Sequence, residues 1–593
     1  MGHAAKVSYH LSIFYLLYII YYIFLISKHI KGAECMIYNI LIGGAAGQGM
    51  ETLAIILEKL FKKKGFEIFT LQDYMSRVRG GHNFFQIRFG NEEISSHCND
   101  IDGIIALNKE TIELHVDELK YTGFIIADQA IEYKDDRLYN LPLKSIAKTI
   151  GNSKVFGNVA LGALLKLFNL NLDYLEDLLK ETFKAEIAVK NFAAFKAGYK
   201  EVSPKYDIKA NGKDQSILIN GNDAIALGAL AAGCKFYSAY PMTPSTTIMN
   251  YLASKIHEAE IVVEQAEDEI AAINMAIGAS YAGVRAMTGT SGGGYALMIE
   301  AIGLSSMLEV PLVVAEIQRP GPTTGFPTRT EQADIKFVIS GTPGEVPKMV
   351  IALRDPEDCF YQTMRAFNLA DKYQIPVILL GDQFLADSLK TVNPFDFKRI
   401  KIERYLSEED YTGDKLYNRY EVTESGVSPR ITPGRIPGKT ILVDSDEHDE
   451  TGHITESGSV RVIMNDKRLR KMEFLKEDLL EPEYIGQDDI DTLLVGWGSI
   501  YGPIKEAVKL LNAQGTEKYG ALVFGDVWPL PDKLIKEKSI KVKKIINVEQ
   551  NATGQLALLI RENTGIQMNG SYLRYDGRPI ASEDIVKKLK GVI

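Results

Sequence analysis

Short apolar runs alternate with small-residue or amphipathic stretches along most of the chain. Examples are residues 37–42 (IYNILI), 310–318 (VPLVVAEIQ) and 491–500 (DTLLVGWGSI), each followed by a turn containing glycine or proline. Helix-forming stretches come after most of these turns, as in residues 49–63 and 502–514. This repeated strand, turn and helix order predicts an α/β protein built from several parallel-sheet domains.

The length of 593 residues predicts about three or four domains. We divide the chain into a first α/β domain at 36–200, a linker at 201–215 and a second domain at 216–393. The linker belongs to a lysine-rich stretch that begins near residue 192. Residues 394–487 are charged and punctuated by proline, which predicts a long connecting segment on the surface. Residues 488–593 form the last domain.

The first 35 residues differ from the rest of the chain. Residues 11–27 are uncharged and mostly apolar, close to the shortest length that spans a membrane. One interpretation is an uncleaved membrane anchor, since no small-residue cleavage site follows. The interpretation we favour is an appended segment, with translation beginning at Met36, where an ordinary first strand starts.

Composition narrows the classes of function. The chain is 46% hydrophobic and 24% charged with a net charge of −10, which argues against a nucleic-acid partner and suits a cytoplasmic enzyme. Its four cysteines, Cys35, Cys98, Cys234 and Cys359, lie far apart in the sequence. No spacing typical of an iron–sulfur cluster or a zinc site is therefore encoded.

The stretch from Cys234 to Asp334 holds the strongest candidates for chemistry. Its first apolar strand stops at YPMTP, residues 240–244, where two prolines prevent further extension. Ser245 or Thr246 could cap a helix that begins near Thr247. Ligands of open α/β sheets gather at the carboxyl ends of strands, so Thr243 is a candidate for holding a substrate.

A second helix is predicted at residues 265–282 and is so apolar that we expect it to be buried. Acidic residues in its first turn complement the helix dipole, which explains Glu264, Glu267 and Asp268. Glu269 lies furthest into the apolar run, where a carboxylate needs a partner or a shifted pKa. Glu269 is therefore a candidate catalytic residue, with the structural and catalytic interpretations about equally supported.

Arg319 follows the buried strand at 310–318 and precedes Pro320-Gly321-Pro322, which keeps it on a loop. A planar guanidinium suits a substrate carboxylate. Arg329 is a second candidate in the same loop.

These motifs resemble the 2-oxoacid:ferredoxin oxidoreductases, and more narrowly the α subunit of the 2-oxoglutarate type with a γ domain fused at its N-terminus. The motifs are YPMTPST, EDEIAAINMAIGAS, TGTSGGG and QRPGPTTGFPTRTEQAD, in that order. The resemblance covers the chain from Met36 to its end. It implies a Rossmann-like γ domain, a thiamine diphosphate pyrimidine-type domain and a transketolase C-terminal-like domain.

The resemblance also implies site residues. Glu269, Gly292 and Gly293 would contact thiamine diphosphate, with Glu269 at the aminopyrimidine. Thr243 and Arg319 would bind the substrate, with Tyr240 and Arg329 beside them. The thiamine motif that binds Mg²⁺ and diphosphate needs Gly-Asp-Gly, and neither Gly381-Asp382 nor Gly525-Asp526 supplies it. A β subunit should therefore hold that half of the cofactor, Mg²⁺ and a [4Fe–4S] cluster, in an (αβ)₂ assembly.

The glycine-rich residues 43–49 (GGAAGQG) could admit an anion at a helix N-terminus. They do not match the dinucleotide fingerprint, so a nicotinamide- or flavin-linked oxidoreductase is a weaker hypothesis. They resemble the γ-domain loop instead, as does YMSRVRGGHN at 74–83. The resemblance places coenzyme A on this side, near Gly44, Gly47, Gly49 and Arg79. An interdomain salt bridge is an equally good interpretation of Arg79.

The predicted reaction is the coenzyme A-dependent oxidative decarboxylation of a 2-oxoacid, with electrons passed to ferredoxin. 2-Oxoglutarate is the favoured substrate; pyruvate, a branched-chain acid or several 2-oxoacids are alternatives. A membrane-tethered binding protein remains a third class. The acidic loop from Asp444 to His453 contains two histidines, but its spacing fits no standard metal site, and a hydrated or interface loop is the better interpretation.

Overall fold

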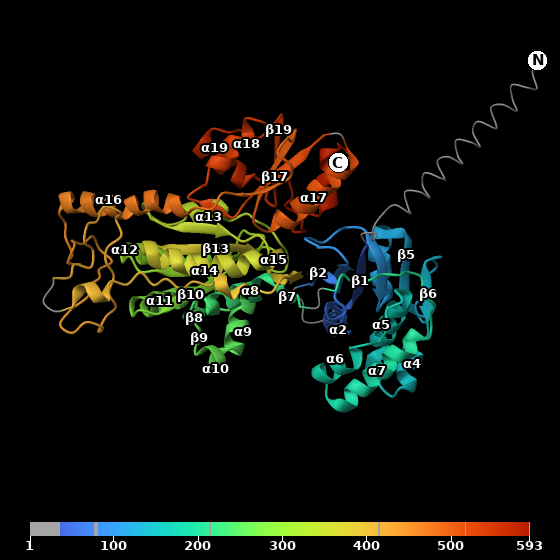
Figure 1. Cartoon of the computed structure of the whole chain (residues 1–593). Coiled ribbons are helices and arrows are strands. Elements are labelled where there is room, and N and C mark those ends of the chain that lie inside the picture. The colour runs from blue at the N-terminus through green and yellow to red at the C-terminus, as the bar shows by residue number, and fades with distance from the viewer. Residues whose placement is uncertain (1–35, 76–80, 213–214, 413–415, 516, 592–593) are drawn as a thin grey trace, which may run out of the picture.

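The computed structural model describes residues 36–75, 81–212, 215–412, 416–515 and 517–591. These residues form three β-sheets, each covered by helices (Figure 1). The α/β class is thus confirmed. Residues 1–35, including the candidate anchor at 11–27, lie outside the described part. Within the described part, none of the helices combines the length and apolar character needed to cross a membrane.

The first sheet has the strand order β6-β5-β4-β1-β3-β2-β14-β7. Its strands are β1 (Ile37–Ala45), β2 (Glu67–Asp73), β3 (His82–Gly90), β4 (Ile101–Ala106), β5 (Leu119–Asp128), β6 (Leu138–Leu141), β7 (Ile217–Asn220) and β14 (Leu389–Val392). The pairs β1–β4, β4–β5 and β5–β6 are parallel, whereas β3 runs antiparallel to both β1 and β2. The first sheet is therefore mixed, with a parallel half and an antiparallel half.

Helices α2 (Met50–Lys63), α3 (Lys109–His115), α4 (Leu143–Thr149), α5 (Phe156–Leu167), α6 (Leu175–Thr182) and α7 (Ala185–Tyr199) belong to this part. Helices α5 and α7 pack closely, because the backbone of each approaches a glycine of the other, Gly162 and Gly198. Helix α7 occupies much of the lysine-rich stretch that begins near residue 192. That stretch is therefore helical as far as Tyr199 rather than a linker from its beginning.

The second sheet carries the central motifs and has the order β18-β12-β13-β11-β10-β8-β9. Its strands are β8 (Cys234–Ala239), β9 (Val262–Gln265), β10 (Arg285–Thr290), β11 (Leu312–Gln318), β12 (Met349–Ala352), β13 (Pro376–Asp382) and β18 (Asp526–Trp528). Its helices are α8 (Gly221–Ala231), α9 (Thr246–Ser254), α10 (Ile256–Ala259), α11 (Glu269–Tyr281), α12 (Gly292–Met307), α13 (Ile335–Ser340), α14 (Pro356–Tyr373) and α15 (Gln383–Asp387). All neighbours are parallel except β12 and β18.

The third sheet has the order β15-β17-β16-β19-β20. Its elements are β15 (Glu483–Ile485), β16 (Thr492–Trp497), α17 (Tyr501–Gln514), β17 (Tyr519–Phe524), α18 (Lys533–Ser539), β19 (Lys544–Glu549), α19 (Gln555–Thr564), β20 (Gly570–Leu573) and α20 (Ser582–Leu589). Four of its strands are parallel, and β15 is antiparallel to β17. Strands β14 and β18 each join the sheet of another part, which ties the three parts together.

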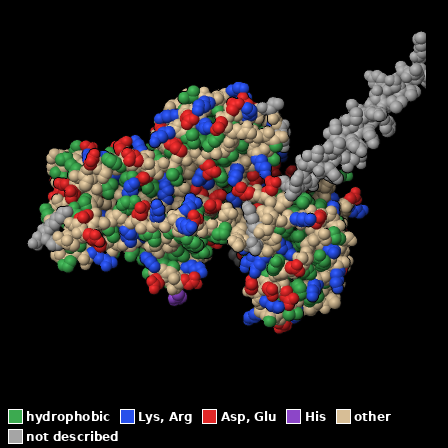
Figure 2. All heavy atoms as spheres, in the orientation of Figure 1, with side chains coloured by type: hydrophobic (Ala, Val, Ile, Leu, Met, Phe, Trp, Pro, Cys, Tyr) green, Lys and Arg blue, Asp and Glu red, His purple; other side chains and the backbone are tan. Residues whose placement is uncertain are grey.

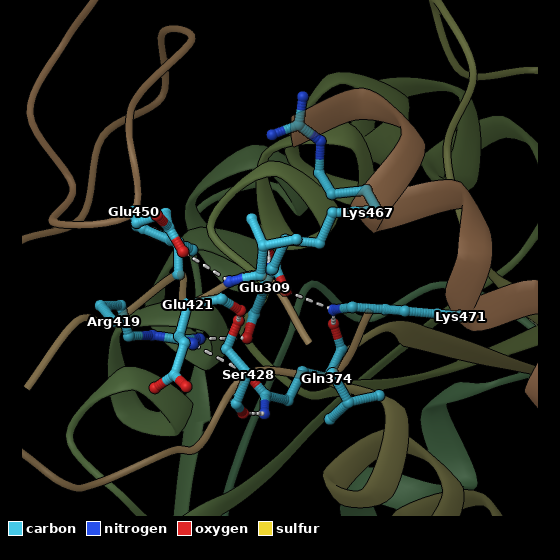
Figure 3. A network of polar contacts seen from close by, with 12 residues as sticks. Glu309, Gln374, Arg419, Glu421, Ser428, Glu450, Lys467 and Lys471 are labelled. Atoms are coloured by element: carbon cyan, nitrogen blue, oxygen red, sulfur yellow. Dashed lines mark hydrogen bonds and ion pairs between the residues drawn. The ribbon is translucent and has the colours of Figure 1, made fainter. Parts of the chain in front are cut away.

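The connecting segment contains a helix that the sequence analysis missed, α16 (Gly458–Leu475). Lys467 and Lys471 of this helix are buried and pair with the two carboxylate oxygens of Glu309, each at 2.5 Å (Figure 3). Arg419 donates to the Glu309 carbonyl oxygen at 2.6 Å. Burial alone would raise the pKa of Glu309, but Lys467, Lys471 and Arg419 hold it well below its ordinary value. Buried ion pairs to Glu309 thus attach the connecting segment to the second domain.

Candidate functional site

The loop after β8 is held by side chains beneath it. Asn222, fully buried in α8, donates Nδ2 to the Pro244 carbonyl oxygen at 2.9 Å and to Thr247 Oγ1 at 2.7 Å. Ser245 occupies the position before α9, as predicted, but its side chain caps nothing; Oγ donates to the Met242 carbonyl oxygen at 2.8 Å. The loop therefore presents Met242 and Thr243 at the carboxyl edge of the sheet.

Arg319 emerges at the same edge, directly after β11. Its Nη1 donates to the Thr243 carbonyl oxygen at 2.7 Å. Among the described residues no carboxylate pairs with this guanidinium, and burial lowers the pKa of Arg319 from its ordinary value. An arginine stays charged in a protein, so the group is a positioned cation that can accept an anion.

Glu269 opens α11 and is 3% exposed. Asp268 caps the helix by accepting a hydrogen bond from the Ala271 amide at 2.7 Å, so the cap does not need Glu269. The Oε1 atom of Glu269 is buried and has no hydrogen-bond partner among the described residues. A buried carboxylate oxygen without a partner is costly, and this one is suited to a ligand that carries a donor.

Three glycines, Gly292, Gly293 and Gly294, begin α12 directly after β10. A Cβ atom on Gly294 would lie 2.5 Å from Glu269 Oε1 and closer still to Thr290 Oγ1. One on Gly292 would lie 2.6 Å from Asp334 Oδ2. Thr290 Oγ1 also donates to Met242 Sδ at 3.9 Å, which links this turn to the Thr243 loop. The sequence analysis named the first two glycines and missed Gly294.

These residues fit the pyrimidine half of thiamine diphosphate. Glu269 offers an unsatisfied acceptor, and the absence of a side chain at Gly294 lets the Glu269 carboxylate lie directly against the start of α12. The two candidate aspartates for the diphosphate half are used structurally. Asp382 caps α15 and accepts from Gln332 Nε2 at 2.9 Å, and Asp526 pairs with Arg365 at 2.6 Å.

A buried carboxyl group behind this site was missed by the sequence analysis. Glu316 of β11 lies beside Thr290 of β10 in the sheet, is fully buried, and has no partner for either carboxylate oxygen among the described residues. Burial raises its pKa well above the ordinary value, and the nearby Asp334 and Asp382 raise it further. Burial also raises the pKa of Asp334 to about 6. Like charges so close disfavour joint ionisation, which favours the neutral form of Glu316.

The two remaining substrate candidates are Tyr240 and Arg329. Tyr240 is 40% exposed at the end of β8. Arg329 pairs with Asp73 of β2 at 3.1 Å and donates to the Tyr74 carbonyl oxygen at 3.3 Å. Arg329 thus joins the central loop to the first domain, and a substrate-binding role for it stays a prediction.

On the coenzyme A side, Gly43, Gly44 and Ala45 belong to β1, so the glycine loop is shorter than predicted. Gly47 and Gly49 have φ of 90° and 83°, which favours glycine. A cavity of about 440 Å³ lies between the first and last domains. Its polar lining includes His82, His97, His115, Arg329, Arg574 and Arg578. Arg79 lies outside the described residues.

The prediction that residues 265–282 are buried was wrong for one face of α11. Ile270 is 49% and Met275 is 42% exposed, and Leu297 of the adjacent α12 is 51% exposed. These apolar side chains form a surface beside Glu269. Elsewhere acidic and basic side chains are interspersed on the face seen in Figure 2.

The loop from Asp444 to His453 is packed at His448 and Glu447, while Ser445, Asp446, Glu450, Thr451 and His453 are exposed. His448 is fully buried against the Tyr420 ring at a centroid distance of 3.9 Å, and Glu447 pairs with Arg468 of α16 at 2.8 Å. In the described part of the chain, no group of three or more His, Cys, Asp or Glu side chains is arranged to hold a metal ion. The loop therefore helps to attach the connecting segment.

Comparison with known proteins finds family matches along most of the chain. Residues 227–467 match the thiamine diphosphate-binding domain of pyruvate flavodoxin/ferredoxin oxidoreductases, 39–201 match the pyruvate ferredoxin/flavodoxin oxidoreductase domain, and 490–585 match core domain II of pyruvate:ferredoxin oxidoreductase. The chain thus carries a thiamine diphosphate-binding domain within an oxidoreductase subunit.

The α subunit of the 2-oxoacid:ferredoxin oxidoreductase of Sulfolobus sp is 32% identical, over 93% of this chain and 96% of that protein. The 2-oxoglutarate oxidoreductase subunit KorA of Mycobacterium tuberculosis is 29% identical over 93% and 88%. The structure of 2-oxoglutarate:ferredoxin oxidoreductase from Magnetococcus marinus, with 2-oxoglutarate, coenzyme A and succinyl-CoA bound, superposes with a TM-score of 0.89. It is 32% identical and covers 94% of this chain and 100% of that one. This chain belongs to the 2-oxoacid:ferredoxin oxidoreductase α-subunit family.

Proposed function

We propose that this chain is the α subunit of an enzyme that oxidatively decarboxylates 2-oxoglutarate to succinyl-CoA and CO₂ and reduces ferredoxin. The observation that supports this best is the position of Arg319, which pairs with no carboxylate of the described residues and donates a hydrogen bond to the Thr243 loop. At the same edge of the sheet, Glu269 keeps a buried oxygen without a partner in the described part of the chain. A cation for a substrate carboxylate and an acceptor for the cofactor are then on one side of the sheet.

Each residue has a distinct role in this proposal. Thiamine diphosphate, when bound, supplies the electron sink that decarboxylation needs. Glu269 would hold a proton shared between Oε1 and a ring nitrogen of the aminopyrimidine. Arg319 would bind the C1 carboxylate of the 2-oxoacid, and the Thr243 hydroxyl would orient its carbonyl.

The choice of 2-oxoglutarate rests on relatives. The Magnetococcus marinus structure contains 2-oxoglutarate and succinyl-CoA, and the Mycobacterium tuberculosis relative is a 2-oxoglutarate oxidoreductase subunit. The Sulfolobus relative is called a 2-oxoacid enzyme, which keeps pyruvate and branched-chain acids as alternative substrates.

A β subunit would complete the site in an (αβ)₂ complex, bringing the diphosphate ligands, Mg²⁺ and a [4Fe–4S] cluster. The exposed apolar face formed by Ile270, Met275 and Leu297 lies beside Glu269 and suits this contact. Coenzyme A would approach from the first domain, near Gly44, Gly47, Gly49 and Arg79. The cytoplasm is the expected compartment, because ferredoxin and coenzyme A are found there.

Co-expression of residues 36–593 with candidate β subunits tests the proposal. The purified complex is assayed for viologen reduction with thiamine diphosphate, Mg²⁺ and coenzyme A, comparing 2-oxoglutarate with pyruvate. We expect reduction that requires the β subunit and is faster with 2-oxoglutarate. If a stable complex forms but fails to reduce viologen with every 2-oxoacid tested, the proposed reaction is refuted. Faster reduction with pyruvate would overturn the substrate alone.

A further inference from the structure

A cavity of about 950 Å³ lies at the amino edge of the second sheet. Its walls come from the loop between α13 and β12, from α16 and the residues after it, and from the loop that follows β18. Thr243 and Arg319 follow their strands, whereas Lys348 of this cavity precedes β12, which runs parallel to β13 and, through it, to β11. The cavity is therefore at the opposite edge from the proposed catalytic site.

Lys348 is the unusual residue of this cavity. It is 2% exposed, and its Nζ donates to Thr342 Oγ1 at 2.9 Å. No carboxylate of the described residues forms an ion pair with it, and burial alone lowers the pKa of Lys348 to about 8. An ammonium group can donate three hydrogen bonds, and a buried cation without an anion is costly. The other two N–H donors of Lys348 therefore have no anionic partner among the described residues.

The other lining residues include apolar side chains and five acidic ones, Glu345, Glu473, Glu477, Glu481 and Asp532. Met472, Trp528 and Leu530 provide an apolar wall. Of these acidic residues, Glu473 pairs with Lys476 and Asp532 pairs with Lys536.

We propose that this cavity is a binding site for a small organic anion, whose carboxylate or phosphate group pairs with Lys348 and Thr342 while its apolar part lies against Trp528, Leu530 and Met472. The ion pair would form away from bulk water, where charge-assisted hydrogen bonds are strongest. Because the walls come from the second domain, the connecting segment and the last domain, the bound anion would join all three and stabilise their arrangement.

Thermal unfolding of the purified chain at constant ionic strength tests this site. The probes are hexanoate and phenyl phosphate, each compared with its neutral counterpart, hexanol or phenol. We expect at least one anion, and neither neutral compound, to raise the unfolding temperature in a saturable way. The more effective of the two anions identifies the head group.

Lys348→Met should abolish the anion-induced rise in unfolding temperature. Loss of a hydrogen bond to a charged group should weaken anion binding about 10- to 100-fold. Without any anion, Lys348→Met should unfold at a higher temperature than the wild type, because it removes an unpaired buried cation. Lys348→Gln provides a second variant of similar length. Lys533→Met, an exposed residue of the same cavity, controls for net charge and should keep the response. A wild type that responds to neither anion, or a Lys348 variant that responds fully, would refute the site.

Discussion

Arg319 Nη1 donates to the Thr243 carbonyl oxygen across 2.7 Å, although the two residues are 76 positions apart in the sequence. Each follows a different strand of the same parallel sheet, β11 and β8. The bond fixes the guanidinium over the loop that carries the Thr243 hydroxyl. Arg319 keeps its remaining donors for a substrate, since no carboxylate of the described chain pairs with it.

Arg319→Met in the complex with the β subunit should lower kcat/KM for the 2-oxoacid about 10- to 100-fold, because a charge-assisted bond to the carboxylate is lost. Arg319→Lys should recover part of the loss, since it restores the charge without the planar fork. Steady-state viologen reduction measures both variants. Arg435→Met, which removes an exposed arginine, is the control, and an equal loss in the control would refute the role.

Gly294→Ala should weaken thiamine diphosphate binding, because its Cβ would lie 2.5 Å from Glu269 Oε1. Overpacking of this kind typically costs about 1–3 kcal/mol, which corresponds to about a 5- to 150-fold weaker affinity. Titration of the complex with the cofactor measures the change. Gly303→Ala changes another glycine of α12, where a Cβ would meet no atom within 4 Å, and should bind normally. Equal affinities in the two variants would contradict the proposed position of the pyrimidine.

Asp334 should make the protein less stable as pH rises. Its pKa is raised from 3.8 to about 6, so between these values the unfolded chain has lost a proton that the folded chain retains. Stability therefore falls from about pH 4 to pH 6, by about 2–3 kcal/mol for a shift of this size. Asp334→Asn should remove this slope in urea unfolding series, with the exposed Asp488→Asn as the control for net charge. An unchanged slope would show that Asp334 is ionised in the folded state.

Glu309→Gln should destabilise the connecting segment by about 3–5 kcal/mol, because Lys467 and Lys471 would be left buried without their anion. Limited proteolysis and thermal unfolding of the variant measure the effect. Glu473→Gln, which removes the exposed pair with Lys476, should change stability by less than about 1 kcal/mol. Similar behaviour of the two variants would contradict an anchoring role for the buried group.

Much of the second domain could be predicted because proline marks where its strands end. The ends of β8 and β11 follow from Pro241, Pro244 and Pro320, and these ends place Thr243 and Arg319. Helix α16 escaped notice because its buried face carries Lys467, Arg468 and Lys471 in place of apolar residues. Hydrophobic periodicity does not detect a helix that is held by ion pairs.

Glu316 was missed for a related reason. It sits inside the apolar run at 310–318, where a single acid looks like an interruption of a strand, and only the packing shows that it has no partner. The exposed face of α11 was assigned to the core because an interface and a core have the same apolar pattern. The antiparallel direction of β3 could not be predicted, because sequence order does not give strand direction.

The role of Glu269 is the central claim, and one comparison tests it most directly. The complex with the β subunit is purified with wild-type chain, with Glu269→Gln and with Glu267→Gln, which changes an exposed acid two residues away. Turnover of 2-oxoglutarate is measured by viologen reduction at saturating thiamine diphosphate. We predict that Glu269→Gln lowers kcat about 10²- to 10⁴-fold while the complex stays assembled, and that Glu267→Gln is active. Wild-type turnover in an assembled Glu269→Gln complex would contradict the account.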